Sequence, residues 1–182
     1  MKKVDGYEKV AADSNVLTYL AESMASEYDP ATDAHTHVAE QRVASIRLFL
    51  YGGNLTAPPT TEEELTQIPD DAARVYQEQI RNILIPELAN LDLEARDKRV
   101  TELLSHHDDP NDCAILAEAE LAGVPYLLTA DKQFRSRLSP HSAVVIETPS
   151  DHWERLEVPH GSEPRIKPHE TNPLAAETWW KW

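Results

Sequence analysis

The chain has 182 residues, 41% hydrophobic residues and a formal net charge of −15. It is long enough for one domain with an extension, and it lacks any run of about 18 apolar residues that could cross a membrane. The acidic balance argues against a broad electrostatic surface for nucleic acid, and the lone cysteine, Cys113, excludes an internal disulfide and favours a cytoplasmic protein.

The first part of the chain predicts a short buried strand followed by helices. Apolar periodicity, helix caps and breakers give these elements in order: a strand over 9–13, a helix from Ser14 or Asn15, a longer helix over 33–51 stopped by Gly52-Gly53-Asn54, an extended segment over 55–58, and a helix starting at 61–65. The stretch 71–105 is predicted to be helical in two pieces, with breaks near Pro86 and Asn90.

The second part predicts a sharply capped helix between strands. Asp109 suits the N-cap and Pro110 the first helical position, so a helix is expected from there to about Ala122. Strands are expected over 124–129 and 143–146. Strands that alternate with helices predict an α/β fold, with a central, mostly parallel sheet covered by helices on both faces in three α/β/α layers.

The character of the sequence changes after residue 148. Residues 149–182 hold five prolines and few aliphatic residues, so we divide the chain into a domain, 1–148, and a C-terminal tail, 149–182, that is extended or only locally folded. The last five residues, Thr178-Trp179-Trp180-Lys181-Trp182, are too aromatic for a solvated tail. They are expected to pack on the domain or on a partner.

Four carboxylates stand where elements of such a fold end or begin. Asp13 follows the first strand and Asp131 follows the strand over 124–129, while Glu64 and Asp112 fall in the first turns of helices. Ligands of open parallel sheets collect outside the carboxyl ends of the strands. A cluster of acids is costly without a cation, so these side chains predict a site with oxygen ligands for Mg²⁺ or Mn²⁺.

Each acid also has a plainer interpretation. Asp13, Asp112 and Asp131 fit helix caps or first-turn acids, and Glu63 competes with Glu64 for the inward position because both fit a capping box. On the helix that begins near Asp112, Glu118 and Glu120 are expected to face solvent.

The run His106-His107-Asp108-Asp109 lacks the second ligand cluster that a zinc site needs. It is expected to be an exposed loop, although it leads directly into Asp112 and could approach the acids.

Two segments resemble the motifs of PIN-domain nucleases. Ala12-Asp13-Ser14-Asn15-Val16-Leu17 is similar to the opening motif of that family. Residues 111–119 (NDCAILAEA) and 123–134 (GVPYLLTADKQF) are similar to its closing motif, and the resemblance spans about residues 9–147. The long helix over 33–51, the helical stretch 71–105 and the tail depart from the compact toxin form of the family.

The resemblance implies a three-layer α/β/α nuclease that binds Mg²⁺ or Mn²⁺ and cleaves RNA. By position, Asp13, Glu64, Asp112 and Asp131 match the four acids of the family, and Thr129 matches a hydroxyl residue near its pocket. Asn15 and Thr129 are candidates to position water or phosphate. Many relatives are toxins of toxin–antitoxin pairs and many dimerise, so an antitoxin or another protein and a second copy of the chain are the expected partners, with no membrane partner.

Two other functions compete with the metal-dependent endoribonuclease. The fold could serve as a non-catalytic binding or assembly module. It could also be a phosphohydrolase with Asp13 as an aspartyl nucleophile, although Asn15 stands where that chemistry usually has a second acid.

Overall fold

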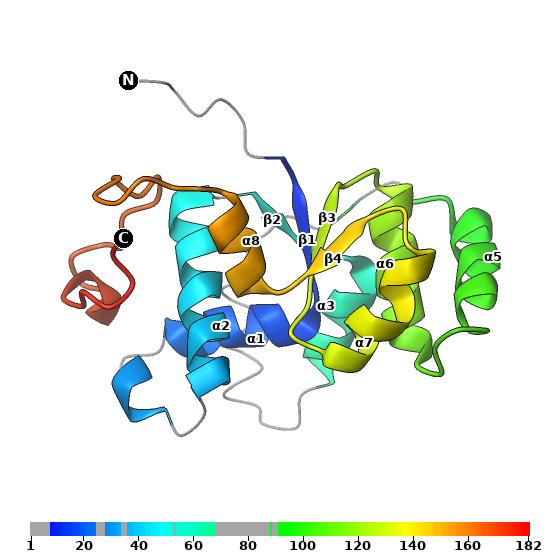
Figure 1. Ribbon diagram of the computed structural model, residues 1–182, viewed down its shortest axis with the longest axis horizontal. Coiled ribbons are helices and arrows are strands. Elements are labelled where there is room, and N and C mark those ends of the chain that lie inside the picture. Colours follow the sequence, from blue (N-terminus) through cyan, green and yellow to red (C-terminus); the bar gives the residue numbers. More distant parts are fainter. Residues whose placement is uncertain (1–7, 25–27, 34–35, 53, 68–87, 89–90) are drawn as a thin grey trace.

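A computed structural model describes residues 8–24, 28–33, 36–52, 54–67, 88 and 91–182 of the chain (Figure 1). Within these residues, four parallel strands form one sheet in the order β2-β1-β3-β4. The strands are β1 (Val10–Ala12), β2 (Leu55–Thr56), β3 (Tyr126–Leu128) and β4 (Val145–Glu147). The predicted α/β fold is confirmed, and the extended segment over 55–58 contributes β2, a strand beyond the three of the predicted strand pattern.

Helices cover both faces of the sheet, as the three-layer prediction requires. The helices are α1 (Ser14–Ser23), α2 (Thr36–Arg47), α3 (Pro59–Thr66), α5 (Leu93–Leu103), α6 (Pro110–Leu121), α7 (Lys132–Leu138) and α8 (Pro149–Arg155). Shorter helical turns are η1 (Pro30–Thr32), η2 (Leu48–Gly52), η3 (Ser139–His141) and η4 (Pro173–Ala175). Figure 1 shows α1, α2 and α8 on one side of the strands and α6 and α7 on the other, with α5 outside α6.

The alternation of side chains along the strands produces two hydrophobic cores. Val10 and Ala12 of β1 and Leu128 of β3 belong to the core beneath α1, α2 and α8. Ala11 follows Val10 and Leu127 precedes Leu128, and these two side chains belong to the core beneath α6 and α7. Successive residues of a strand face opposite sides of its sheet, so even these three-residue strands bury both faces.

Three predicted helices differ from their expected bounds. The helix expected to start at 61–65 is α3, which begins at Pro59, so Glu64 lies beyond its first turn and no capping box forms. The helix expected over 33–51 is α2 over Thr36–Arg47, and the chain then widens into the π-helix η2. Of the stretch 71–105, residues 71–87 and 89–90 lie outside the described residues, and α5 occupies Leu93–Leu103. The capped helix is confirmed, since Asp109 accepts hydrogen bonds from the amides of Asn111 and Asp112, and Pro110 begins α6.

The C-terminal segment follows the surface of the domain and packs against it. It begins with α8, whose Trp153 lies in the same core as residues of β1 and α1. Trp180 is buried in that core, and its indole N–H donates to the carbonyl of Leu174 over 2.9 Å. Arg47 of α2 donates to the carbonyls of Trp179, Trp180 and Lys181 and holds its guanidinium 4.7 Å from the ring centre of Trp182. The aromatic end was expected to pack on the domain or on a partner, and in the structure it packs on the domain.

We expect Trp180→Ala to lower the free energy of unfolding by about 3–5 kcal/mol, because it removes a large buried ring and leaves a cavity. Urea denaturation followed by circular dichroism measures this change. Glu177→Ala, an exposed position on the same segment, serves as the control and should change stability by less than about 0.5 kcal/mol. Equal stability of the two variants would mean that the segment contributes nothing to the fold.

Candidate acidic site at the carboxyl ends of the strands

Asp13 lies at the carboxyl end of β1 and is almost fully buried. It caps α1 by accepting a hydrogen bond from the amide of Ser14 over 2.6 Å. Its second oxygen accepts from the Thr129 hydroxyl over 2.7 Å and from the Asn15 side chain. The helix-cap interpretation is therefore correct for Asp13, and the same carboxylate also joins the ends of β1 and β3.

Asn15 and Thr129 complete a polar link across these two strand ends. The Asn15 amide donates to the Thr129 hydroxyl over 3.1 Å, and the Asn15 carbonyl accepts from the amide of Ala130 over 2.9 Å. Thr129 Oγ1 also accepts from the amide of Asp131 over 3.0 Å. Both supporting residues predicted from the sequence therefore touch Asp13 or the chain leading to Asp131.

Asp112 projects from the first turn of α6 and contacts His107. Its Oδ2 lies 2.6 Å from Nε2 of His107, whose ring is 7% exposed. The expectation of an exposed histidine loop is thus wrong for His107, although His106 stays exposed and stacks on His141 with 3.5 Å between ring centres. The N-cap Asp109 and the first helical residue Pro110 lie between His107 and Asp112 in the chain, so the contact spans the capped turn.

Glu64, rather than Glu63, faces the other acids. Glu64 Oε1 accepts a hydrogen bond of 2.9 Å from the side chain of Asn111, the residue just before Asp112. Glu63 is exposed. The helix α3 packs against α6, and this packing brings Glu64 beside the first turn of α6.

Asp131 caps α7 at the carboxyl end of β3. Its Oδ1 accepts from the amides of Gln133 and Phe134 over 2.6 and 3.0 Å. Asp131 and Asp112 line the same hollow of about 340 Å³, together with His107, Asp108, Asp109, Pro110, Gln133 and Arg137. Arg137 makes no ion pair with any described residue, so the hollow presents a cation beside four carboxylates.

Burial and mutual repulsion disfavour the charged forms of two of these acids. Burial raises the pKa of Asp13 to about 7, the hydrogen bond from Thr129 opposes the rise, and the charges of Asp112 and Glu64 add to it. Burial raises the pKa of Asp112 to about 6, its hydrogen bond with His107 opposes the rise, and the charges of Asp109 and Asp131 add to it. The charges of Asp112 and Glu64 therefore act on Asp13, and the charge of Asp131 acts on Asp112.

The donor set suits a hard cation, but the side chains do not converge as ligands. Among the described residues, no group of three His, Cys, Asp or Glu side chains is arranged to hold a metal ion. Asp112, Asp131 and Glu64 each have one carboxylate oxygen occupied by the contact given above. The second oxygen of each has no hydrogen-bond donor in the described part of the chain. Oxygens of this kind are the ligands that Mg²⁺ and Mn²⁺ prefer.

Three residues near the acids were not predicted as site residues: His107, Asn111 and Arg137. His107 and Asn111 hold Asp112 and Glu64 in place through side-chain contacts, while Arg137 supplies charge. The sequence held a sign of His107 and Asn111, since His107 precedes the predicted helix start and Asn111 lies directly before Asp112. Arg137 lies six residues after Asp131 on α7, and nothing in its local sequence distinguishes it from the neighbouring Arg135.

No protein-family model matches this chain, and no curated protein sequence matches it. None of the described helices is long and apolar enough to span a membrane.

The raised pKa values predict that metal-free protein loses stability as the pH rises. Each carboxyl has an ordinary pKa of 3.8 in the unfolded chain. In the folded chain the pKa is about 7 for Asp13 and about 6 for Asp112. Between these limits the folded state holds protons that the unfolded state has released, so the free energy of unfolding falls as pH increases from about 4 to 7. The melting temperature, measured in EDTA across this range, should fall accordingly and level off above pH 7.

The variant Asp13→Asn should show a flatter profile over the same range, because it removes the group with the highest pKa. Glu63→Gln should keep the wild-type slope, since this side chain lies outside the cluster. A wild-type melting temperature that does not change between pH 5 and 7 would contradict the electrostatic description of the site.

Proposed function

We propose that this protein is a metal-dependent endoribonuclease of the PIN type, which hydrolyses RNA phosphodiester bonds at Asp13, Glu64, Asp112 and Asp131. One observation carries the proposal. Acids from four separate elements, at the end of β1, in α3, in α6 and before α7, interact electrostatically at one edge of the sheet. A fold gains nothing in stability from such repulsion, so an external positive charge is the natural partner of the cluster.

The chain's own residues would bind and orient the reacting groups. Glu64, Asp112 and Asp131 each offer the oxygen that no described residue contacts, while Asn111 and His107 fix the rotamers of Glu64 and Asp112. Thr129 and Asn15 hold Asp13 against the strand ends. A bound Mg²⁺ or Mn²⁺ would supply Lewis-acid stabilisation of the phosphate and a more acidic water.

Arg137 is the residue in the hollow best suited to contact the RNA backbone. It lines the hollow with Asp112 and Asp131 and has no described ion-pair partner. A guanidinium matches the geometry of a phosphate through paired N–H donors. In a chain with a net charge of −15, local cations of this kind, rather than a broad basic surface, would hold the substrate.

The resemblance extends the proposal to partners and location. An antitoxin, a homodimer and a toxin role stay predictions from the PIN resemblance. A cytoplasmic location is supported by Cys113, which is buried and is the only cysteine.

One observation favours a second candidate, a non-catalytic module with the same fold. The described carboxylates are each engaged by local donors and do not converge on a common point. A module of this kind would bind Mn²⁺ weakly or not at all. An aspartyl phosphohydrolase has less support, because both oxygens of Asp13 accept hydrogen bonds and the residue is 3% exposed.

Purified protein should cleave single-stranded or structured RNA in the presence of Mn²⁺ or Mg²⁺ and lose this activity in EDTA. The variants Asp112→Asn and Glu64→Gln each remove a charge from the cluster and should reduce the cleavage rate at least about 100-fold. Cleavage of a labelled RNA, resolved on a denaturing gel, measures these rates.

Glu63→Gln is the matched control for Glu64→Gln, since it makes the same change on an adjacent, exposed residue and should leave the rate within about twofold. Wild-type activity in Asp112→Asn would refute the assignment of the site. Calorimetry with Mn²⁺ distinguishes the second candidate, for which we expect no specific binding and no cleavage.

We expect Thr129→Val to shift Mn²⁺ binding to higher pH. The Thr129 hydroxyl stabilises the charged form of Asp13, so its loss should raise the pKa of Asp13 further and increase competition by protons. Calorimetric titrations at several pH values measure the pH at which Mn²⁺ affinity is half-maximal. An unchanged midpoint would mean that Asp13 does not take part in binding the cation.

A further inference from the structure

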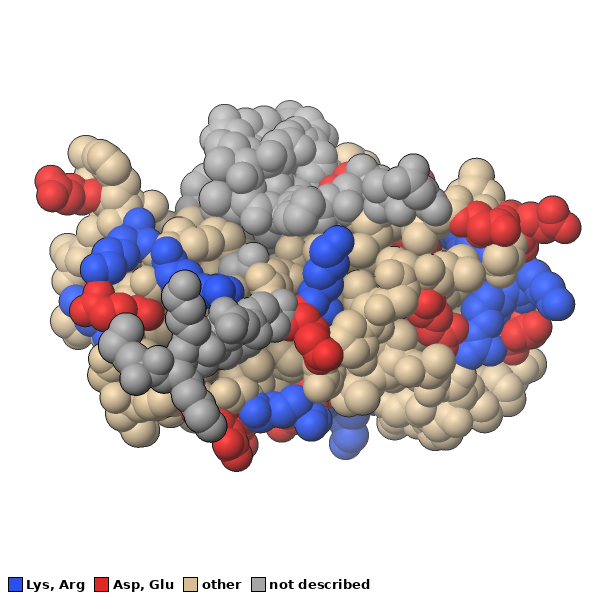
Figure 2. Space-filling view, turned by 90° about the horizontal axis from the view of Figure 1, so that it is seen from above, with Lys and Arg blue, Asp and Glu red and all other residues tan. Residues whose placement is uncertain are grey.

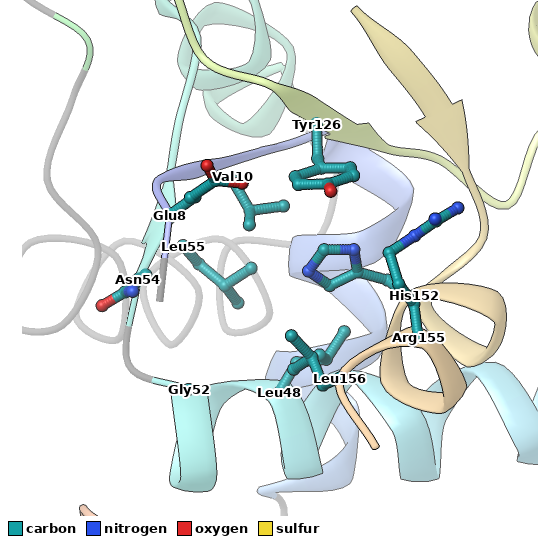
Figure 3. A pocket seen from close by; sticks show the side chains of 10 residues that line it. All are labelled: Glu8, Val10, Leu48, Gly52, Asn54, Leu55, Tyr126, His152, Arg155 and Leu156. Carbon is teal, nitrogen blue, oxygen red and sulfur yellow. The ribbon is translucent and has the colours of Figure 1, made fainter. Parts of the chain in front are cut away.

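A second pocket lies at the opposite edge of the sheet, at the amino ends of the strands (Figure 3). Its wall includes Val10, Leu55 and Tyr126, the first residues of β1, β2 and β3. The cavity has a volume of about 290 Å³ and is closed on the other side by η2 and α8. It is separate from the acidic site, because the two lie beyond opposite ends of the same strands.

A buried histidine with a fixed orientation faces this cavity. His152 of α8 is 3% exposed, and its Nδ1 lies 2.6 Å from Oε1 of Glu147. Arg155 binds the same carboxylate through Nε and Nη2, with distances of 2.5 to 3.1 Å. Burial raises the pKa of Glu147, but the hydrogen bonds from His152 and Arg155 lower it by more, so Glu147 is a charged acceptor.

The fixed orientation of the His152 ring determines which hydrogen-bonding atom the cavity presents to a ligand. Because Glu147 can only accept, Nδ1 of His152 carries the proton of that hydrogen bond. In the neutral ring, Nε2 is then an acceptor, and it has no partner among the described residues. Figure 3 shows the ring projecting from α8 into the pocket between Tyr126 and Leu156.

The rest of the lining is mainly apolar, with the carboxylate of Glu8 and the side chain of Asn54 as further polar groups. Val10, Leu48, Leu55 and Leu156 contribute aliphatic surface. The Tyr126 ring packs edge-on against His152 with 4.8 Å between ring centres, and its hydroxyl has no described partner. Arg155 is neutralised by Glu147. On this side of the molecule, Figure 2 shows acidic and basic side chains interspersed among the atoms drawn in colour.

We propose that this pocket binds a small, uncharged aromatic molecule that donates one N–H or O–H hydrogen bond to Nε2 of His152. The apolar lining and the two rings suit a flat aromatic body, and Nε2 of His152, held as an acceptor by Glu147, calls for a donor on the ligand. At about 30 Å³ per water-sized group, the volume accommodates about ten non-hydrogen atoms. The proposal does not depend on the nuclease assignment, since it uses none of the acidic residues.

Indole and 1-methylindole test this proposal on the intact protein. The two probes share their aromatic body, but only indole can donate to Nε2, so indole should bind about fivefold or more tightly. Calorimetry measures both affinities. Indole should also shift the Nε2 resonance of His152 in a long-range ¹H–¹⁵N spectrum of the histidine rings. Failure of indole to bind, or equal binding of the two probes, would overturn the proposal.

The variant His152→Phe should abolish the preference for indole, because it keeps a ring of similar size and removes the acceptor. His141→Phe, a change at an exposed histidine outside the pocket, should keep the preference. A preference that persists in His152→Phe would also overturn the proposal. If His152→Phe does not fold, the comparison of the two probes on the wild-type protein still decides.

Discussion

The hydrogen bond from Thr129 to Asp13 joins the two central strands where both end, and the segments that follow these strands are linked through it. Leaving a carboxylate 3% exposed is unfavourable unless donors surround it, and here Ser14, Asn15 and Thr129 supply them. The same contacts start α1 directly after β1 and hold the turn that leads to Asp131 and α7. One buried acid therefore determines how the chain leaves the sheet on both of its central strands.

Local sequence was sufficient for the features that depend on neighbours along the chain. The cap at Asp109, the helix that follows it and the strand before Thr129 are formed by residues within a few positions of one another, and each was predicted. Glu118 shows where this approach fails. It was expected to face solvent, but it is 1% exposed because Arg96 of α5 and Thr60 of α3 bind it. Those partners come from distant elements, so helical periodicity alone could not reveal them.

In the candidate site, too, features set by neighbours along the chain were predictable, and contacts between distant elements were not. The positions of Asp13 and Asp131 after strands follow from the order of elements, and the choice of Glu64 over Glu63 follows from which face of α3 meets α6. The contact of His107 with Asp112 forms because the loop before α6 folds back toward that helix. The sequence of this loop is typical of an exposed loop. The docking of the last tryptophans on α2 depends on Arg47, more than 130 positions away, whose role appears only when both segments are placed.

Two buried acids of this sheet have opposite surroundings, and the contrast bears on function. Glu147, at the end of β4, has Arg155 and His152 as partners, which keep its pKa low. Asp13 has only neutral donors, and burial, followed by the charges of Asp112 and Glu64, raises its pKa to about 7. The chain thus contains a buried carboxylate with cationic partners, yet no described Lys or Arg pairs with any of the four clustered acids. Arg137 lines the hollow of Asp112 and Asp131, and protons on Asp13 and Asp112, or a bound cation, would balance more of the charge of the cluster. This contrast between the surroundings of Glu147 and those of Asp13 is the physical basis for proposing a bound cation at the cluster of acids.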